Sequence, residues 1–244
     1  MHLSIRVGAL RLCAALMAAC AAVPAGAASL EVAPTKLVVD GKSGAATLTL
    51  ANRGTVPIIV QLEGFTWEQT NGEDVLKPTD AVLVSPPMAR IPAGGKQTVR
   101  IMARGNSQPG VERTYRLFAS ELPDPASNEA RTIRVLLQFN VPVFVDTPAV
   151  AAPQVTWAAQ MGEKGLALSA RNLGRAHTKF TKIEVVTQSG RRLPATSQGV
   201  PYLLSGATRT FQVAGAFGPA EKVTVEAHTD DSEVVIRETV DVHR

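Results

Sequence analysis

Few residues of this chain have the types and spacing that chemistry requires. The four histidines, His2, His177, His228 and His243, lie far apart, and the two cysteines both fall within the first 20 residues. The sequence has no His-x-x-x-His pair, cysteine cluster or Asp-x-Asp loop, which are common spacings of metal ligands. It also has no Gly-x-Ser-x-Gly elbow, P-loop or dinucleotide fingerprint. We therefore expect no metal and no cofactor, and binding rather than catalysis.

Carboxylates offer one enzymatic alternative. Hydrolysis of a glycosidic bond needs two carboxyl groups on a cleft, and Glu63, Glu68 and Glu73 stand near Trp67. A tryptophan in this setting is more often a core or rim aromatic than a platform for a sugar. An exported carbohydrate hydrolase is kept as an alternative only.

The residues best suited to binding form an alternating row. Between Arg131 and Val145 every second residue is apolar, namely Ile133, Val135, Leu137, Phe139, Val141, Val143 and Val145. A period of two is that of a β-strand, and this strand would be more than twice the ordinary length of about 5–6 residues. Such a strand either crosses a large core or offers apolar surface to another molecule. We expect burial of the three valines in their own core, whereas both possibilities stay open at this point for Ile133–Leu137.

The segments that must position this row of apolar residues are also predicted to be β-strands. Alternating segments bounded by Gly, Pro and Asn predict strands near residues 29–39, 45–51, 57–67, 80–85, 96–103, 113–121, 131–145, 154–159, 165–171, 179–187, 207–213, 221–228 and 233–242. Segment 146–153 has two prolines and no periodicity, so we interpret it as a stiff linker. The pattern predicts an all-β fold of two tandem immunoglobulin-like sandwiches, with domains at 28–147 and 148–244.

The two halves also repeat a short pattern. In each, an alternating strand ends in Asn-x-Gly, at Asn52–Gly54 and at Asn172–Gly174. Both residue types tolerate the left-handed turn conformation. The repeat supports two domains of one kind.

Residues 1–27 have the pattern of an export signal. Arg6 and Arg11 are the only charges before Glu31, residues 12–23 are apolar, and residues 25–27 form a small-x-small cleavage site. The apolar run is shorter than the roughly 20 residues that span a bilayer. We therefore expect an exported chain that is not embedded in a membrane.

The remainder of the chain is nearly neutral and lacks cysteine. Cys13 and Cys20 lie in the signal, so no disulfide is expected. Removing residues 1–27 takes away 2 of the 25 Lys and Arg and none of the 21 Asp and Glu, which leaves a net charge of +2. Without a clustered basic run, nucleic acid is not an expected partner. Segment 17–20, Met-Ala-Ala-Cys, resembles a lipobox, which leaves lipidation open as a second interpretation.

Four segments together resemble a known family. They are PTKLVVDG at 34–41, VSPP at 84–87 with IPAGGKQTVRI at 91–101, YRLFASELP at 115–123, and VPVFV at 141–145. In this order, behind an export signal, they are similar to the periplasmic pilus-assembly chaperones of chaperone–usher systems. The resemblance covers nearly the whole mature chain. Segments 137–145 and 202–209 are most similar to the archaic branch of that family.

The resemblance implies a periplasmic chaperone of two immunoglobulin-like domains in a boomerang arrangement. Such a chaperone binds pilus subunits by donor-strand complementation and delivers them to an outer-membrane usher. Matched to the family, Ile133, Val135 and Leu137 are the donor side chains, with Phe139 as a fourth. The resemblance leaves open whether the free chain caps its own strand by dimerising.

The resemblance also implies cations that hold the C-terminal carboxylate of the subunit. The first-strand arginine of the family pattern aligns with Lys36, whereas the family's lysine on the long strand aligns with Pro142 and is absent. Arg100, in a matching Val-Arg-Ile motif, is the substitute we expect, with Arg134 behind it. An inward-leaning structural role for Arg100 stays open.

The interdomain ion pair of many members cannot form unchanged. Asp146 stands where they carry an arginine, and Glu121 matches their acidic partner. Arg171 or Arg175 could replace the missing cation.

A secreted surface or pilus subunit is the alternative function. Such subunits generally have a donor extension and one incomplete domain, often with a disulfide. This chain has two complete-looking domains and no cysteine after the signal.

Overall fold

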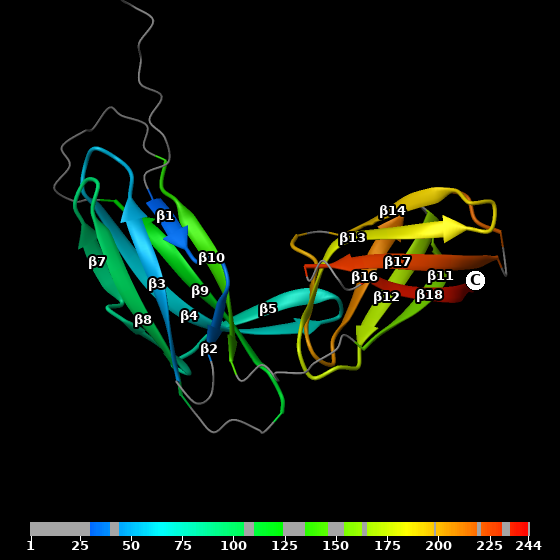
Figure 1. The fold of residues 1–244 in the computed structure, drawn as a ribbon, viewed down its shortest axis with the longest axis horizontal. Helices are drawn as coiled ribbons and strands as arrows, with labels where there is room; N and C mark the ends of the chain where they lie inside the picture. Colours follow the sequence, from blue (N-terminus) through cyan, green and yellow to red (C-terminus); the bar gives the residue numbers. More distant parts are fainter. Residues whose placement is uncertain are drawn as a thin grey trace, which may run out of the picture.

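The computed structural model describes residues 30–39, 44–104, 110–123, 135–145, 154–162, 165–197, 199–218, 221–230 and 235–243. All regular elements in these ranges are β-strands, arranged in two lobes that meet at an angle (Figure 1). The prediction of an all-β fold with two immunoglobulin-like sandwiches is therefore confirmed. The expected signal peptide and the expected linker at 146–153 lie outside the described residues. A search of the described chain for an apolar helix of membrane-spanning length finds no candidate.

The first lobe is a sandwich of two sheets. One sheet has the order β1 (Leu30–Ala33), β3 (Ala45–Asn52), β8 (Lys96–Ala103), β6 (Val82–Ser85). The other has the order β2 (Leu37–Val39), β10 (Gln138–Val145), β9 (Arg113–Leu122), β4 (Ile58–Thr70), β5 (Glu73–Pro78), with β7 (Met88–Ile91) beside β4. Alternate side chains of these strands meet between the sheets, as the period of two requires. Val141, Val143 and Val145 are buried in this core, which confirms their predicted role.

The chain changes sheets near its beginning. We predict one strand over 29–39, but β1 pairs with β3 in one sheet and β2 pairs with β10 in the other. Pro34 lies between them and has no N–H for either ladder. Lys36 therefore stands at the crossing between the two sheets, immediately before β2.

The described residues of the second lobe form eight strands. They are β11 (Val155–Gly162), β12 (Gly165–Asn172), β13 (Thr178–Thr187), β14 (Arg192–Thr196), β15 (Tyr202–Leu203), β16 (Thr208–Val213), β17 (Lys222–Thr229) and β18 (Val235–His243). Strand β14 pairs with both β16 and β13, and β11 pairs with both β12 and β18. These pairings join the two layers at their margins. The backbone groups of β14 and β11 therefore have hydrogen-bonding partners within the lobe.

The Asn-x-Gly repeat marks two equivalent buried asparagines. The side chain of Asn52 donates to the carbonyls of Val56 (2.8 Å) and Ile91 (3.1 Å), and Asn172 donates to Ala176 (2.8 Å) and Leu203 (3.1 Å). Neither asparagine has a positive φ. The repeated residue thus serves as a hydrogen-bond hub that satisfies turn carbonyls, rather than as a left-handed turn residue.

The long strand is shorter than predicted. Strand β10 begins at Gln138, while residues 135–137 precede it outside the ladder and residues 131–134 lie outside the described chain. One backbone bond continues the pairing, from the N–H of Glu121 to the carbonyl of Leu137 (2.8 Å). Its partner β9 ends at Leu122, which is level with Leu136, so residues before 136 have no neighbouring strand in the described chain. Backbone groups need a partner to form a ladder, and apolar alternation alone does not provide one.

Candidate functional site

One margin of β10 is open in the described chain. Strand β9 pairs with β10 along its whole length, from Gln138 to Val145. On the opposite margin β2 pairs only with Val143–Val145. The margin from Gln138 to Pro142 therefore has no partner among the described strands. An unpaired row of backbone groups is a template for another strand.

The apolar side chains along this margin extend beyond the core of their own lobe. Leu137 and Phe139 are half-buried and pack at the border of the core. Val135 is 74% exposed and Leu136 is 41% exposed. Of the expected donor residues, the structure therefore leaves Val135 exposed and places Leu137 and Phe139 half-buried at the border of the core. Ile133 lies outside the described residues.

Lys36 lies at the end of the open margin. Leu37 is level with Val143 in the β2–β10 ladder, so Lys36 stands level with Pro142, where pairing with β2 stops. Its ammonium group contacts Asp230 of the second lobe, with 3.2 Å between Nζ and Oδ2. The cation expected at the anchor is therefore already bound across the junction of the lobes.

Arg100 lies in a different setting. It is exposed on β8 of the other sheet, between buried Val99 and Ile101, and pairs in register with Thr47 and Ser85. Its exposure contradicts the inward-leaning alternative. Among the described residues, Arg100 shares no interaction with Lys36, and Arg134 lies outside the described chain.

The structure reveals a cation that sequence reasoning missed. Arg116 on β9 is directly opposite Pro142 in the ladder. Its side chain is only 7% exposed, and its guanidinium carbon lies 3.5 Å from the centroid of the Trp67 ring. Burial lowers the pKa of Arg116, while the nearby Asp74 carboxylate opposes that shift. An arginine nevertheless keeps its charge at neutral pH. Lys36 and Arg116 therefore place positive charge on both sides of Pro142, although the long strand has no cation at that position.

An aromatic cluster joins the two lobes. Trp67 and Phe144 come from the first lobe but belong to the core of the second. The Trp67 ring meets Tyr202 edge to face at 5.2 Å between centroids, and Phe144 stacks on His177 at 3.5 Å. Such contacts stabilise beyond the apolar area they bury. They hold the lobes together beside the open margin.

A buried carboxylate reinforces this junction. Glu112 accepts a hydrogen bond from the backbone N–H of His177 (2.8 Å) and contacts its ring Nδ1 (2.9 Å). The N–H of Glu112 donates to the carbonyl of Arg175 (3.1 Å). The interlobe contacts thus use Glu112 where we expected Glu121, which is buried within the first lobe. The alternation pattern offers no means of finding this pair, because its members are 65 residues apart.

The hairpin of β4 and β5 reaches from the first lobe onto the second (Figure 1). Its turn is Asn71–Gly72, with positive φ at both residues, as a two-residue hairpin turn prefers. The Gln69 amide donates to the carbonyl of Tyr202 (2.9 Å) and accepts from the N–H of Leu204 (3.0 Å). The hairpin is therefore fixed to the backbone of the second lobe by the Gln69 side chain, in addition to the packing of Trp67.

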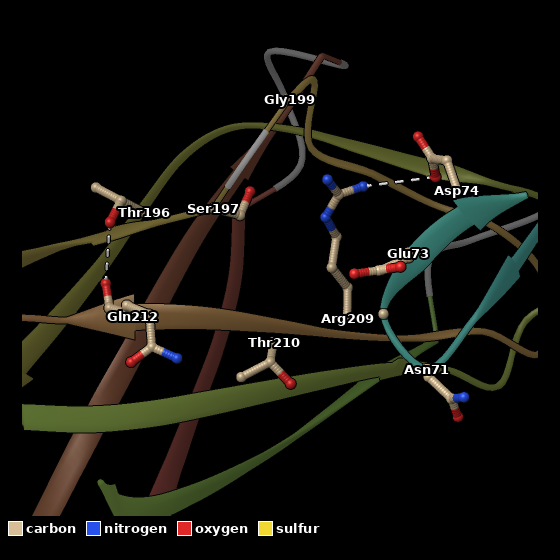
Figure 2. A pocket seen from close by; sticks show the side chains of 10 residues that line it. Asn71, Glu73, Asp74, Thr196, Ser197, Gly199, Arg209, Thr210 and Gln212 are labelled. Atoms are coloured by element: carbon tan, nitrogen blue, oxygen red, sulfur yellow. Dashed lines mark hydrogen bonds and ion pairs between the residues drawn. The ribbon is translucent and has the colours of Figure 1, made fainter. Parts of the chain in front are cut away.

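A polar crevice of about 650 Å³ lies between this hairpin tip and β14 and β16 (Figure 2). Arg209 points across it toward Asp74, with 3.9 Å between Nη1 and Oδ1, and donates to the carbonyl of Tyr202 (3.2 Å). The contact between Arg209 of the second lobe and Asp74 of the hairpin therefore joins the two lobes across the crevice.

The glutamates named for the hydrolase alternative do not share one crevice, because Glu63, Glu68 and Glu73 line three different ones. Trp67 is 1% exposed within the interlobe core, so its ring is not available for stacking. Glu68 contacts Lys77 across the hairpin, at 3.9 Å. Within the described ranges, no group of three or more His, Cys, Asp or Glu side chains is arranged to hold a metal ion.

Two immunoglobulin-like sandwiches with an open margin beside their junction define a class of binding protein. A family model described as "Pili and flagellar-assembly chaperone, PapD N-terminal domain" matches residues 29–150, which is half of the sequence. The chain therefore belongs to this chaperone family, and the predicted membership is confirmed. A comparison with curated proteins finds no match.

Solved structures share the fold at low sequence identity. A chain of the CsuC–CsuE chaperone–tip adhesion subunit pre-assembly complex, from archaic chaperone-usher Csu pili of Acinetobacter baumannii, is 19% identical, with a TM-score of 0.68 over 89% of this chain and 100% of that chain. The E. coli chaperone DraB is 20% identical, with a TM-score of 0.58 over 87% and 95%. The Pseudomonas aeruginosa CupB2 chaperone is 16% identical, with a TM-score of 0.56 over 87% and 100%.

Proposed function

We propose that this protein is a periplasmic chaperone that captures pilus or fimbrial subunits by lending them β10, and that it delivers them to an outer-membrane usher. Membership of the pilus-chaperone family supports the class of function. The observation that carries the mechanism is the open margin of β10, next to exposed Val135 and half-buried Leu137 and Phe139. An incomplete sheet can complete itself on such a margin by strand addition.

The physical gain comes from two sources. Full burial of Val135, Leu137 or Phe139 in a subunit groove would contribute about 1.5–3 kcal/mol each. Each new backbone bond along Gln138–Pro142 would add about 0.5–1.5 kcal/mol net. Ile133 remains part of the proposed donor row. The same margin would also accept a second copy of this chain, so a self-capping dimer stays a prediction.

Strand addition predicts protection of the backbone at the open margin. We expect those amides of residues 135–141 that face the open margin to exchange slowly with solvent deuterium when a subunit is bound and rapidly in the free chaperone, because β9 pairs only the amides on the other side. Hydrogen exchange followed by mass spectrometry measures this. Peptides of β16 serve as an internal control. Unchanged exchange at residues 135–141 in a purified complex would rule out strand donation.

We further propose that the subunit's C-terminal carboxylate binds Lys36, with Arg100 as second cation. A strand added to the open margin would reach Lys36 where the margin ends, level with Pro142. A carboxylate leaving water needs such a charge-assisted partner. Buried Arg116, opposite Pro142, adds positive potential at the same level.

Charge reversal tests this anchor. We expect Lys36→Glu to weaken binding by up to about tenfold, since an exposed ion pair is worth at most about 1 kcal/mol and reversal adds repulsion. Arg100→Glu should weaken binding as well. The probe is a synthetic peptide in which valine and threonine alternate over one strand length, measured by calorimetry with a free carboxylate and with a C-terminal amide. Lys77→Glu, on the exposed hairpin, is the control. If both reversals leave the carboxylate peptide unaffected, the anchor lies elsewhere.

A further inference from the structure

Lys36, the proposed anchor, already binds a carboxylate of this chain, that of Asp230. Asp230 follows β17 directly, and its N–H donates to the carbonyl of Lys179 (2.9 Å). This bond fixes the backbone of Asp230 at the lobe junction. Its Oδ2 contacts Lys36 Nζ at 3.2 Å. The ligand chemistry at Lys36 is therefore the chemistry expected of a subunit's C-terminus.

We infer that Asp230 is an internal competitor, which occupies Lys36 in the free chaperone and is displaced by the carboxylate of the subunit. The inference rests on the proposed function and adds a specificity-determining residue to the same site. Because Asp230 belongs to the second lobe and Lys36 to the first, displacement would also open one of the contacts between the lobes. Capture of a subunit is thereby coupled to that contact.

The contact between Lys36 and Asp230 can be replaced by another carboxylate at little energetic cost. The side chains of Lys36 and Asp230 are 45% and 31% exposed, and an exposed ion pair contributes little to stability. Lysine is a point charge on a flexible stem, so Nζ can turn to a new carboxylate without movement of the backbone. A carboxylate carried by a paired strand arrives at a high effective concentration.

The rest of the junction survives this exchange. Glu112 is buried with His177, and its side chain has no exposed surface, so the main interlobe pair does not depend on Lys36. The side chain of Asp230 is 31% exposed, so water can solvate its carboxylate after Lys36 has left it.

Asp230→Asn tests the competition, because asparagine keeps the shape and removes the charge. We expect the variant of the full chain to bind the alternating peptide with a free carboxylate about two- to fivefold more tightly than the unmodified protein does, and to bind the amide peptide equally. Lys36→Ala together with Asp230→Asn should abolish the gain. Asp241→Asn is the matched control, since Asp241 faces Lys222 at 4.0 Å on an exposed strand pair. Calorimetry of each peptide supplies the affinities, and thermal unfolding checks that each variant is folded.

The outcomes distinguish the competition by Asp230 from the proposed function on which it rests. If the unmodified protein prefers the carboxylate peptide while Asp230→Asn binds it equally or more weakly, Asp230 positions Lys36 and the competition is overturned. If the unmodified protein binds carboxylate and amide alike, the anchor at Lys36 fails, and the competition fails with it. A gain for both peptides would show that Asp230 acts on the whole cleft, which also contradicts competition for the carboxylate.

Discussion

Replacing Val135 and Leu137 with aspartate is expected to abolish subunit capture and to leave the chaperone folded. Each apolar side chain would contribute about 1.5–3 kcal/mol on burial in the subunit, so losing both should weaken binding at least about a hundredfold. A carboxylate buried without a partner would add a further penalty. The measurement is co-purification of a co-expressed pilus subunit with the tagged chaperone.

Two variants keep this result interpretable. Leu137 also packs at the border of its own core, so its replacement could destabilise the lobe. Val135 is 74% exposed, and Val135→Asp alone should lose capture with an unchanged melting temperature. Val56→Asp is the control, because Val56 is 55% exposed on a loop of the same lobe. Retained co-purification by folded Val135→Asp would contradict donation by this row.

Replacing Trp67 with alanine is expected to uncouple the two lobes. Truncating a buried tryptophan costs about 3–5 kcal/mol, and Trp67 contacts Phe144, Tyr202 and the guanidinium of Arg116 at once. Its loss would leave Arg116 without its stacking partner. We expect the calorimetric unfolding of the chaperone to split into two transitions, and the radius of gyration from small-angle scattering to increase.

Trp67→Phe separates packing from hydrogen bonding. The indole Nε1 of Trp67 has no hydrogen-bond partner in the described chain, so phenylalanine should restore most of the coupling. If Trp67→Ala unfolds in one transition at the original temperature, the side-chain hydrogen bonds of Gln69 hold the lobes together without the ring. Capture measured in parallel would then show whether the lobe junction positions the open margin.

The residues alone predicted the fold class, which the structure confirms, and they also predict the proposed donor row. Alternation at a period of two identified most long strands, because a strand with one buried face must bury every second side chain. Strands β5, β7, β14 and β15 were missed, since each is too short to establish a period of two. The Asn71–Gly72 dipeptide was the available hairpin signal for β5.

In the candidate site, too, some residues follow from the sequence and others only from the tertiary structure. Val135, Leu137 and Phe139 follow from the sequence pattern, because side-chain direction along a strand is a local property. The end of β10, its open margin and the level of Lys36 depend on which strands pair and in what register. Arg116 opposite Pro142, and Asp230 against Lys36, join residues that are 26 and 194 positions apart. Only the tertiary structure decided those contacts, because backbone pairing and packing of the two lobes bring together groups that no local period relates.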